Sequence, residues 1–421
     1  MKKIIALLLA AMLLTGCAVP RQTDRGESGE LTIAAASDLH YLAPALTDNG
    51  PLFQKVVANG DGKLMLDIEA ITEAFVEQMI DERPELLILS GDLCFNGERL
   101  SHEELARKLE RIEQAGVQVL VLPGNHDLNA SRALCYEGEG CEPVDSVDAE
   151  QFRTIYADFG YDEALSIDEA SGSYVYAPDS AHRIIMLDTN SLHSNSFPEE
   201  SFAWLEKQLR QARRAGAQVI SVSHQNLLIH NGLFVFGYQI MNAEKLQEQL
   251  VRYGVSLHLS GHMHIQHALT DGLTEILTSP LSMTPCRYAA LLWSGGTLDY
   301  EARSVDVAAW AAEQGLNDEK LLHFDEYARD FFRKTAYDKT RAQCLAAGFS
   351  AEQAERLAAG FADANLSYFT GVRPDRDRLA EELAYWTEHA GEGLETVYLR
   401  GILEDESPDP LKIVINTGKS G

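Results

Sequence analysis

The chain has 421 residues, of which 45% are hydrophobic and 24% are charged, so it has the composition of a folded protein and the length to bury more than one core. Its formal net charge is −29, from 35 basic against 64 acidic residues. Such a surface repels nucleic acid at long range, which excludes a nucleic-acid polymer as the expected partner. An anionic small molecule requires positive charge concentrated at its binding site, and bound metal ions supply it.

The N-terminus has the pattern of a secretory signal. Two lysines precede an apolar stretch, residues 4–14, which is too short to cross a bilayer as a helix. The Leu-Thr-Gly-Cys sequence that ends at Cys17 resembles the lipobox of bacterial lipoproteins, in which the cysteine is acylated and becomes the new N-terminus. We therefore expect a signal peptide over residues 1–17, a tether over residues 18–30, and a protein held on the outer face of the cytoplasmic membrane by the lipid on Cys17.

Residues 31–305 repeat one rhythm, in which a short aliphatic run is followed by a polar motif and then by an amphipathic stretch. This rhythm predicts an α/β domain of alternating strands and helices. The predicted strands are 31–36, 86–90, 117–122, 183–187, 219–223 and 255–260, with one further strand over 289–299. Ile68, Ile71, Phe75 and Met79 fall on one face of a predicted helix between the first two strands.

From about residue 306 the chain is rich in Ala, Glu and Arg and shows no strand signals, so we expect a helical C-terminal domain over residues 306–421. Two capping boxes are predicted, Ser101 with Glu104 in the first domain and Ser350 with Gln353 in the second. The tail from residue 405 contains two prolines and is expected to be irregular or partly extended.

Polar motifs follow five of the predicted strands. They are Asp38-Leu39-His40, Gly91-Asp92, Gly124-Asn125-His126-Asp127, His224, and Gly261-His262-Met263-His264. In α/β sheets, ligands bind at the carboxyl ends of the strands, and Asp, Asn and His donors suit divalent Mn, Fe or Zn. An Asp-x-His or His-x-His sequence on extended backbone directs both side chains to one side, and the glycines permit close approach. Each motif alone is ordinary turn or core chemistry, but the ordered set predicts a metal site.

This ordered set resembles the calcineurin-like metallophosphoesterase family, over roughly residues 31–305. The resemblance implies a two-sheet β-sandwich flanked by helices, an α/β (α+β) fold, and hydrolysis of a phosphoester with two divalent metal ions. It also implies the ligands. One ion is expected on Asp38, His40 and His264, the other on Asn125, His224 and His262, with Asp92 bridging the two.

The same resemblance implies that His126 is not a ligand and that it stabilises or protonates the leaving group, oriented by Asp127. The chain departs from the family pattern at Gln225, where relatives often have a second histidine after His224. This departure leaves the substrate contacts there open. Further polar residues have two interpretations, substrate contact or ordinary loop polarity; they are Asn96, Asn129, Asn226 and His230.

A closer likeness is to lipid-anchored bacterial cyclic-nucleotide phosphodiesterases, which carry a helical C-terminal domain. It rests on residues 37–42, 60–63 (Gly-Asp-Gly-Lys) and 260–264. The likeness implies a small cyclic-nucleotide-type diester as substrate. Two alternatives remain, a phosphomonoesterase or protein phosphatase on the same core and a non-catalytic, surface-anchored binding lipoprotein. The physiological substrate, the native metals and the oligomeric state stay open.

Cys135 and Cys141 flank a short acidic loop, and their spacing is compatible both with a disulfide and with two free thiols. Cys94, Cys286 and Cys344 are expected to be buried thiols, because none lies in a Cys-x-x-Cys pattern.

Overall fold

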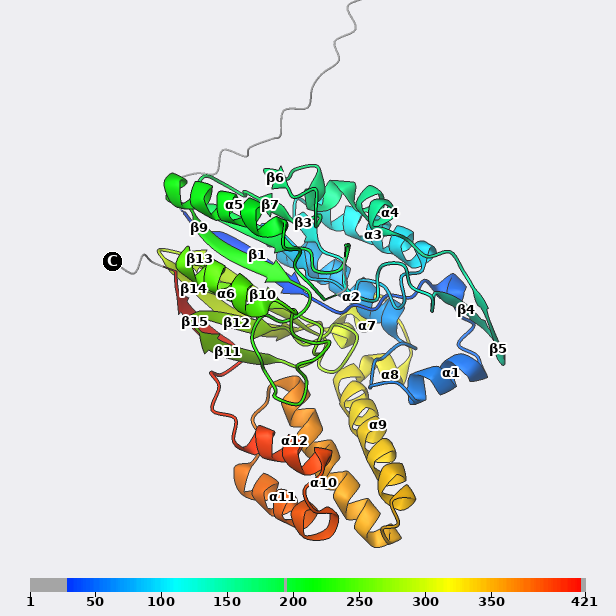
Figure 1. Ribbon diagram of the computed structural model, residues 1–421. Helices are drawn as coiled ribbons and strands as arrows, with labels where there is room; N and C mark the ends of the chain where they lie inside the picture. The colour runs from blue at the N-terminus through cyan, green and yellow to red at the C-terminus, as the bar shows by residue number, and fades with distance from the viewer. Residues whose placement is uncertain (1–28, 193–194, 418–421) are drawn as a thin grey trace, which may run out of the picture.

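Two β-sheets and a group of helices make up the computed structural model, which describes residues 29–192 and 195–417 (Figure 1). The sheets lie in the upper part of the view, and the helices of the C-terminal region extend below them. The expected signal peptide with Cys17, and most of the tether, lie outside the described residues. None of the helices in the described part of the chain is long and apolar enough to cross a bilayer.

The first sheet combines parallel and antiparallel strands. Its strands are β1 (Leu31–Ala36), β2 (Leu86–Leu89), β3 (Gln118–Val121), β13 (Arg287–Ser294), β14 (Thr297–Ser304) and β15 (Lys412–Asn416), in the order β15-β14-β13-β1-β2-β3. β1, β2 and β3 are parallel, with Ile33 opposite Leu86, whereas β13, β14 and β15 join antiparallel. Helices α2 (Ile68–Glu82) and α3 (Arg99–Gln114) pack on this sheet, and the apolar face predicted for α2 is buried.

The second sheet has the order β11-β12-β10-β9-β8-β7-β6. Its strands are β6 (Ser166–Ile167), β7 (Tyr174–Tyr176), β8 (His182–Leu187), β9 (Gln218–Ser223), β10 (Leu257–Ser260), β11 (His267–Asp271) and β12 (Leu273–Leu277). β8, β9, β10 and β12 are parallel neighbours. Helices α5 (Ser201–Ala215) and α6 (Ala243–Arg252) cover its outer face.

Alternating side chains show that the two sheets face each other. In β8, Ile184 and Met186 belong to the core shared with the first sheet, whereas Ile185 and Leu187 pack with α5 and α6. Because successive residues of a strand point to opposite faces, one strand contributes to both cores. The predicted two-sheet sandwich flanked by helices is therefore confirmed.

Shorter elements complete the region before residue 306. They are the 3-10 helix η1 (Pro44–Leu46), α1 (Pro51–Ala58), the hairpin of β4 (Leu134–Glu137) and β5 (Gly140–Pro143), α4 (Ala149–Ile155) and the π-helical turn η2 (Ala157–Tyr161). Cys135 and Cys141 lie on the hairpin as free thiols. Cys141 is opposite Tyr136, the residue after Cys135, so the two thiols point to opposite faces and cannot pair in this register.

Three details of the sequence prediction are wrong. The single strand expected over 289–299 is a hairpin, because Gly295 and Gly296 both adopt positive φ and reverse the chain between β13 and β14. Ser101 does not cap a helix, since α3 begins at Arg99 and the Ser101 hydroxyl accepts a hydrogen bond from the Ala43 N–H at 3.1 Å. The tail does not end in the helical domain, because β15 pairs with β14 and buries Ile415 in the first sheet.

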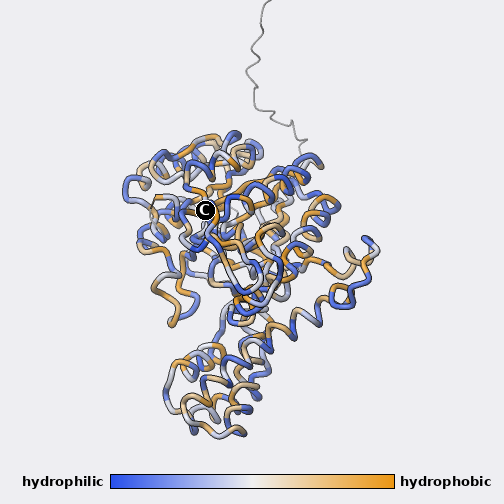
Figure 2. The backbone as a smooth tube through the Cα atoms, turned by 90° about the vertical axis from the view of Figure 1, so that its right-hand side faces the viewer, coloured by the Kyte–Doolittle hydropathy of each residue, from blue (hydrophilic) through white to orange (hydrophobic). Residues whose placement is uncertain are grey.

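The C-terminal helices are α7 (Val307–Glu313), α8 (Glu319–Leu322), α9 (Phe324–Ala346), α10 (Ala351–Thr370), α11 (Arg376–Ala390) and α12 (Leu394–Leu403). Ser350 and Gln353 form the predicted capping box at the start of α10. Hydrophobic and hydrophilic residues alternate along these helices (Figure 2). The buried residues of α7, α8 and the start of α9 join the core of the first sheet. The apolar faces of α10, α11 and α12, with the end of α9, form a separate core that also contains Met263, Ile265 and Leu277, so these helices pack on the loop that follows β10 and on β12.

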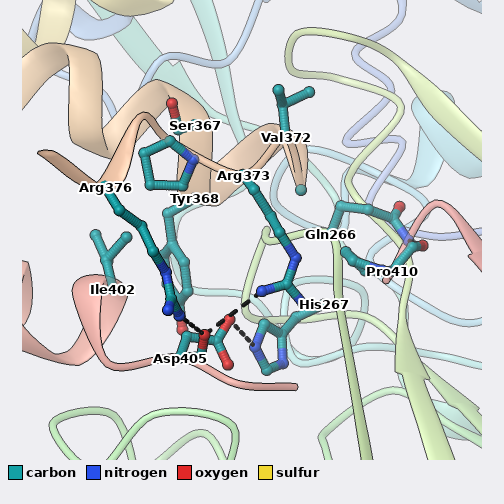
Figure 3. Close-up of a pocket in the computed structure, with 12 residues that line it drawn as sticks. Gln266, His267, Ser367, Tyr368, Val372, Arg373, Arg376, Ile402, Asp405 and Pro410 are labelled. Atoms are coloured by element: carbon teal, nitrogen blue, oxygen red, sulfur yellow. Dashed lines mark hydrogen bonds and ion pairs between the residues drawn. The ribbon is translucent and has the colours of Figure 1, made fainter. Parts of the chain in front are cut away.

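A small pocket marks the junction where the chain leaves α12 for β15 (Figure 3). The guanidinium groups of Arg373 and Arg376 donate to the main-chain carbonyl of Asp405, at 3.5 and 2.9 Å. The Asp405 carboxylate lies 3.2 Å from Nε2 of His267, on β11. These contacts join the helical region to the second sheet at β11, which begins shortly after the motif residue His264.

Candidate dimetal centre

The predicted motif residues meet at one edge of the sandwich. Asp38 and His40 follow β1, Asp92 follows β2, and His224 directly follows β9, while His262 and His264 follow β10. These strands are parallel within their sheets, so their carboxyl ends meet at the same rim, as expected for a ligand site in an α/β fold.

The backbone reaches this arrangement by a route that the sequence did not predict. Asp38, His40, Asp92, His262 and His264 all have φ between 48° and 65°, in the left-handed region. The expected extended Asp-x-His and His-x-His segments are therefore absent from these loops. Non-glycine residues in this conformation are strained by roughly 1–3 kcal/mol each and occur where the surrounding structure or function requires them.

The first group of donors consists of Asp38, His40, Asp92 and His264, whose donor atoms lie within 4.8 Å of one another. Nε2 of His264 is 3.3 Å from Oδ1 of Asp38 and 3.4 Å from Nε2 of His40. Nε2 of His40 is 3.7 Å from Oδ2 of Asp92. Asp38, His40 and Asp92 are buried, so these carboxylates and imidazoles converge away from solvent.

The second group consists of Asp92, His224 and His262. Nε2 of His224 is 3.3 Å from Oδ1 of Asp92 and 3.1 Å from Oδ1 of Asn125, which brings the amide predicted as a ligand into the same group. The two carboxylate oxygens of Asp92 thus face the two groups separately. This is the geometry required of a bridging ligand.

Two observations test whether divalent ions fit these groups. Oδ1 of Asp38 is buried and, among the described residues, receives no hydrogen bond, which leaves a carboxylate oxygen without a donor. Nδ1 of His224 contacts the Ser90 carbonyl at 3.0 Å, so Nδ1 carries a proton and Nε2 is the nitrogen that faces the group and would bind an ion. Mixed carboxylate, amide and imidazole donors suit borderline divalent metals. The residues therefore fit two ions that share Asp92.

Glycines in the motifs leave room for the donors. A side chain on Gly124 would begin 2.2 Å from Oδ1 of Asp92, and one on Gly261 would begin 2.5 Å from Oδ2 of Asp38. Both distances are far inside van der Waals contact. These glycines are required because the donor carboxylates pack against their Cα atoms.

The electrostatics of the donor groups favour bound cations. Burial alone raises the pKa of Asp92, but the charges of His224, His126 and His40 hold it well below its ordinary value. For His224, burial lowers the pKa, yet the Asp92 carboxylate outweighs it and raises the pKa to about 9. The carboxylates therefore stay ionised in a buried space, where their negative charge must be balanced by positive charge, and divalent ions would supply it when bound.

His126 lies beside the first group, with its ring centroid 5.0 Å from that of His40. Its Nδ1 is 3.0 Å from the Phe95 carbonyl and 3.2 Å from Oδ1 of Asn96. Asn96, one of the candidates for substrate contact, therefore orients His126 instead.

The prediction that Asp127 orients His126 is wrong. The Asp127 carboxylate accepts hydrogen bonds from the N–H groups of Gly124, Leu93 and Cys94, at 2.8 to 3.1 Å. It ties the loop after β2 to the loop after β3. Asp127 also belongs to a buried group with Cys94 and His102. The nitrogens of His102 already contact the Tyr156 hydroxyl and the Asp127 carbonyl, so that group is a structural hydrogen-bond cluster.

The other polar candidates are distributed between the interior and the surface. Gln225 is buried and exchanges hydrogen bonds with Asn190, which explains how the chain accommodates glutamine there. Asn226 is buried and donates to the Leu228 carbonyl, and His230 is buried against Glu275. Asn129 is exposed. Gln225, Asn226 and His230 do not line the cavity next to the donor groups, which is described in the next paragraph.

A cavity of about 720 Å³ opens from the donor groups toward the helical region. Its polar end includes Asp92, His126, His262 and His264, and its opposite wall comes from α9, α10 and α12. The segment 233–238 contributes apolar and aromatic side chains. Asp61 and Lys63 also line this cavity. The Gly-Asp-Gly-Lys segment that contains them contributed to the family resemblance in the sequence analysis, but no role was predicted for either residue.

The shared carboxylate between two histidine-rich groups at the strand ends defines a dimetal phosphoesterase, a hydrolase. Comparison with family models agrees. A model described as calcineurin-like phosphoesterase matches residues 31–266, more than half of the chain, and one described as the C-terminal domain of cyclic nucleotide phosphodiesterase matches residues 306–409. The chain belongs to the calcineurin-like phosphoesterase family.

Solved structures with similarity to this chain include two phosphatases and a nucleotidase. A dimetal phosphatase from Danio rerio shares 14% identity, with a TM-score of 0.47 over 65% of this chain and 96% of that one. Purple acid phosphatase PPD1 from yellow lupin (Lupinus luteus) shares 14%, with a TM-score of 0.43 over 66% and 52%. NAD nucleotidase from Haemophilus influenzae shares 13%, with a TM-score of 0.33 over 65% and 49%. The search of curated proteins gave no match.

Proposed function

We propose that this enzyme is a phosphodiesterase that acts on small, cyclic-nucleotide-type diesters. The observation that carries the proposal is the cavity between the donor groups and the helical region. Its volume of about 720 Å³ lies within the range of roughly 300–1,000 Å³ that is usual for small-molecule sites. The helices that wall it belong to the region matched by the cyclic nucleotide phosphodiesterase C-terminal domain.

Aromatic rings lead from the donor groups to the helices. Tyr238 lies 5.3 Å from His262 and 5.4 Å from Phe234, measured between ring centroids. Phe234 is 6.2 Å from Tyr398 on α12, which is 5.5 Å from Phe361 on α10. Aromatic faces stack on nucleobases with about 1–3 kcal/mol per base. A nucleotide would therefore fit the cavity with its phosphate at the donor groups and its base against these aromatic rings.

His126 is the residue that donates a proton to the leaving oxygen in this proposal. Two divalent ions bound by the donor groups supply positive charge that activates water and neutralises phosphoryl oxygens. The Phe95 carbonyl only accepts hydrogen bonds, so Nδ1 of His126 carries a proton. Nε2 is then the atom that holds a second proton and gives it to the leaving oxygen. Burial lowers the pKa of His126, so its doubly protonated form is a stronger acid but a smaller fraction of the enzyme at neutral pH.

A substrate screen tests the proposal. The purified, Mn-loaded protein is assayed with bis- and mono-nitrophenyl phosphate and with 2′,3′- and 3′,5′-cyclic nucleotides. We expect a preference for diesters, with the highest kcat/KM on a cyclic nucleotide. A preference for monoesters would support the phosphomonoesterase or phosphatase alternative. Loading of both metals without turnover of any ester would support the binding-lipoprotein alternative.

We also propose that the enzyme acts outside the cytoplasmic membrane, held by a lipid on Cys17. The support is the N-terminal sequence, in which two lysines and a short apolar stretch precede the Leu-Thr-Gly-Cys segment. Cys17→Ser is expected to shift the protein from the membrane fraction and to leave the precursor unacylated. Unchanged membrane retention would contradict the anchor.

A further inference from the structure

The Gly60–Lys63 segment connects a candidate metal ligand to a lysine. Oδ2 of Asp61 is 3.2 Å from Nδ1 of His264, the nitrogen that faces away from the donor group, and 2.7 Å from Nζ of Lys63. A carboxylate behind a ligating imidazole fixes its tautomer and orientation. Lys63 is therefore anchored to the site by the same oxygen that orients His264.

Lys63 supplies positive charge at a position where the protein has little. The net charge of the chain is −29. Among the described residues, the lysines and arginines that line the cavity are Lys63 and Lys339. The Lys63 side chain is only 13% exposed, and its ammonium has three donors, of which Asp61 uses one. Lys63 lines the same cavity as Asp92, His126 and His264.

Helix α9 holds this segment in place. Nζ of Lys339 donates to the Gly60 carbonyl. Gly62 has φ +99°, and a side chain there would begin 2.6 Å from the ring of Phe332, so the main chain packs directly on α9. On its other side, the Leu64 N–H donates to the Ser282 carbonyl at 2.7 Å. The segment is fixed between the helical region and the catalytic region.

We propose that Lys63 binds the anionic phosphoester group of the substrate, and that α9 positions Lys63 through the Gly60–Lys63 segment. The proposal rests on phosphoester hydrolysis at this site, and it holds whether the ester is a cyclic nucleotide or another small phosphate. It gives the helical region a role in binding phosphate in addition to forming a wall.

Inorganic phosphate, as a product-type ligand, tests the proposal without turnover. Its binding to the Mn-loaded protein is measured by calorimetry, together with metal content and with KM and kcat for bis-nitrophenyl phosphate. Lys63→Met is expected to weaken phosphate binding and raise KM roughly ten- to a hundredfold, the usual worth of a hydrogen bond to a charged group, with both metals retained. Lys63→Arg should recover most of the loss. Lys334→Met, at an exposed lysine of α9, is the control for loss of a lysine and should change nothing.

Two results would overturn the role of Lys63. Unchanged phosphate binding in Lys63→Met would show that the lysine does not contact the anion. Loss of metal from Lys63→Met to the same extent as from Asp61→Asn would show that it acts only through Asp61 and His264. A parent enzyme that binds phosphate but hydrolyses none of the esters would refute the proposed function and leave this test intact.

Lys339→Met tests the positioning by α9. We expect it to weaken phosphate binding in the parent but to add nothing in the Lys63→Met background, because both changes remove one interaction with phosphate. Multiplicative losses would show that Lys339 binds phosphate independently and would overturn the positioning role.

Discussion

The two walls of the cavity differ in origin and in chemistry. One wall consists of loops that follow parallel strands, and it gathers carboxylates and imidazoles around the shared Asp92. The other consists of α9, α10 and α12, and it presents aromatic and aliphatic side chains from a region that begins after residue 306. Under the proposed function, bond cleavage depends on the first wall and substrate choice depends mainly on the second. Substitutions on the helical wall away from Lys339 should therefore leave metal binding and cleavage largely intact.

Asp92→Asn tests the strand-end wall and has the largest expected effect. Because the oxygens of Asp92 face both donor groups, the variant should lose both ions. Its turnover should fall by more than the roughly 10–100-fold that removal of an outer hydrogen-bond partner of a ligand costs. Metal analysis of the purified protein measures the loss. His264→Ala is the control and should lose mainly one ion; equal loss of both ions from both variants would contradict the division into two groups.

His126→Ala sharpens the contrast between binding metal and moving a proton. Both ions should remain, while turnover of a cyclic nucleotide falls about 10²–10⁴-fold, the usual contribution of general acid catalysis. Nitrophenolate leaves without much protonation, so the loss on bis-nitrophenyl phosphate should be smaller. Kinetics on both esters with metal-saturated protein measure this. Equal losses would indicate that His126 positions phosphate, and loss of metal would show that it is a ligand.

Ala336→Trp tests the helical wall. Ala336 lines the cavity from α9, so the larger ring should occupy the space expected for a nucleobase. KM for a cyclic nucleotide should rise roughly tenfold, within the range for steric discrimination in a pocket, while KM for mono-nitrophenyl phosphate changes little. Ala346→Trp, at an exposed position near the end of the same helix, is the control. An equal rise in KM for both esters would contradict the separation of the two walls.

Asp405→Asn, at the junction between the helices and the second sheet, has the smallest expected effect, which is on stability. Partial burial raises its pKa, but His267 and the Ser407 N–H outweigh this and hold the pKa below its ordinary value. Because the pKa of Asp405 is lower in the folded than in the unfolded protein, the ionised carboxylate stabilises the fold at pH values above its unfolded-state pKa of about 4. This stabilisation is lost progressively as the pH falls from that value through the folded-state pKa. Asp405→Asn should therefore cost about 1 kcal/mol at pH 7 and less at pH 3. Denaturant midpoints of the metal-free proteins measure this, and a cost independent of pH would contradict it.

The sequence predicted the donor set because each motif is local and follows a recognisable strand. It did not predict how the loops bend, since left-handed φ at Asp38 and His262 depends on contacts with other loops. The role of Asp127 was predicted wrongly, because its partners Leu93 and Cys94 lie 34 and 33 positions away in the chain.

The helical wall was hidden from the sequence for the same reason. Its aromatic residues, such as Phe361 and Tyr398, have the spacing of ordinary core positions, and only tertiary packing directs them into a cavity. The return of β15 to the first sheet was also missed, because a five-residue strand after two prolines carries little signal of its own.

Anomalous diffraction from crystals of the Mn-loaded enzyme tests the central claim most directly. We predict two peaks, one next to Asp38, His40 and His264 and the other next to Asn125, His224 and His262, with Asp92 in contact with both. A single peak, or a second ion bound away from Asp92, would contradict the account.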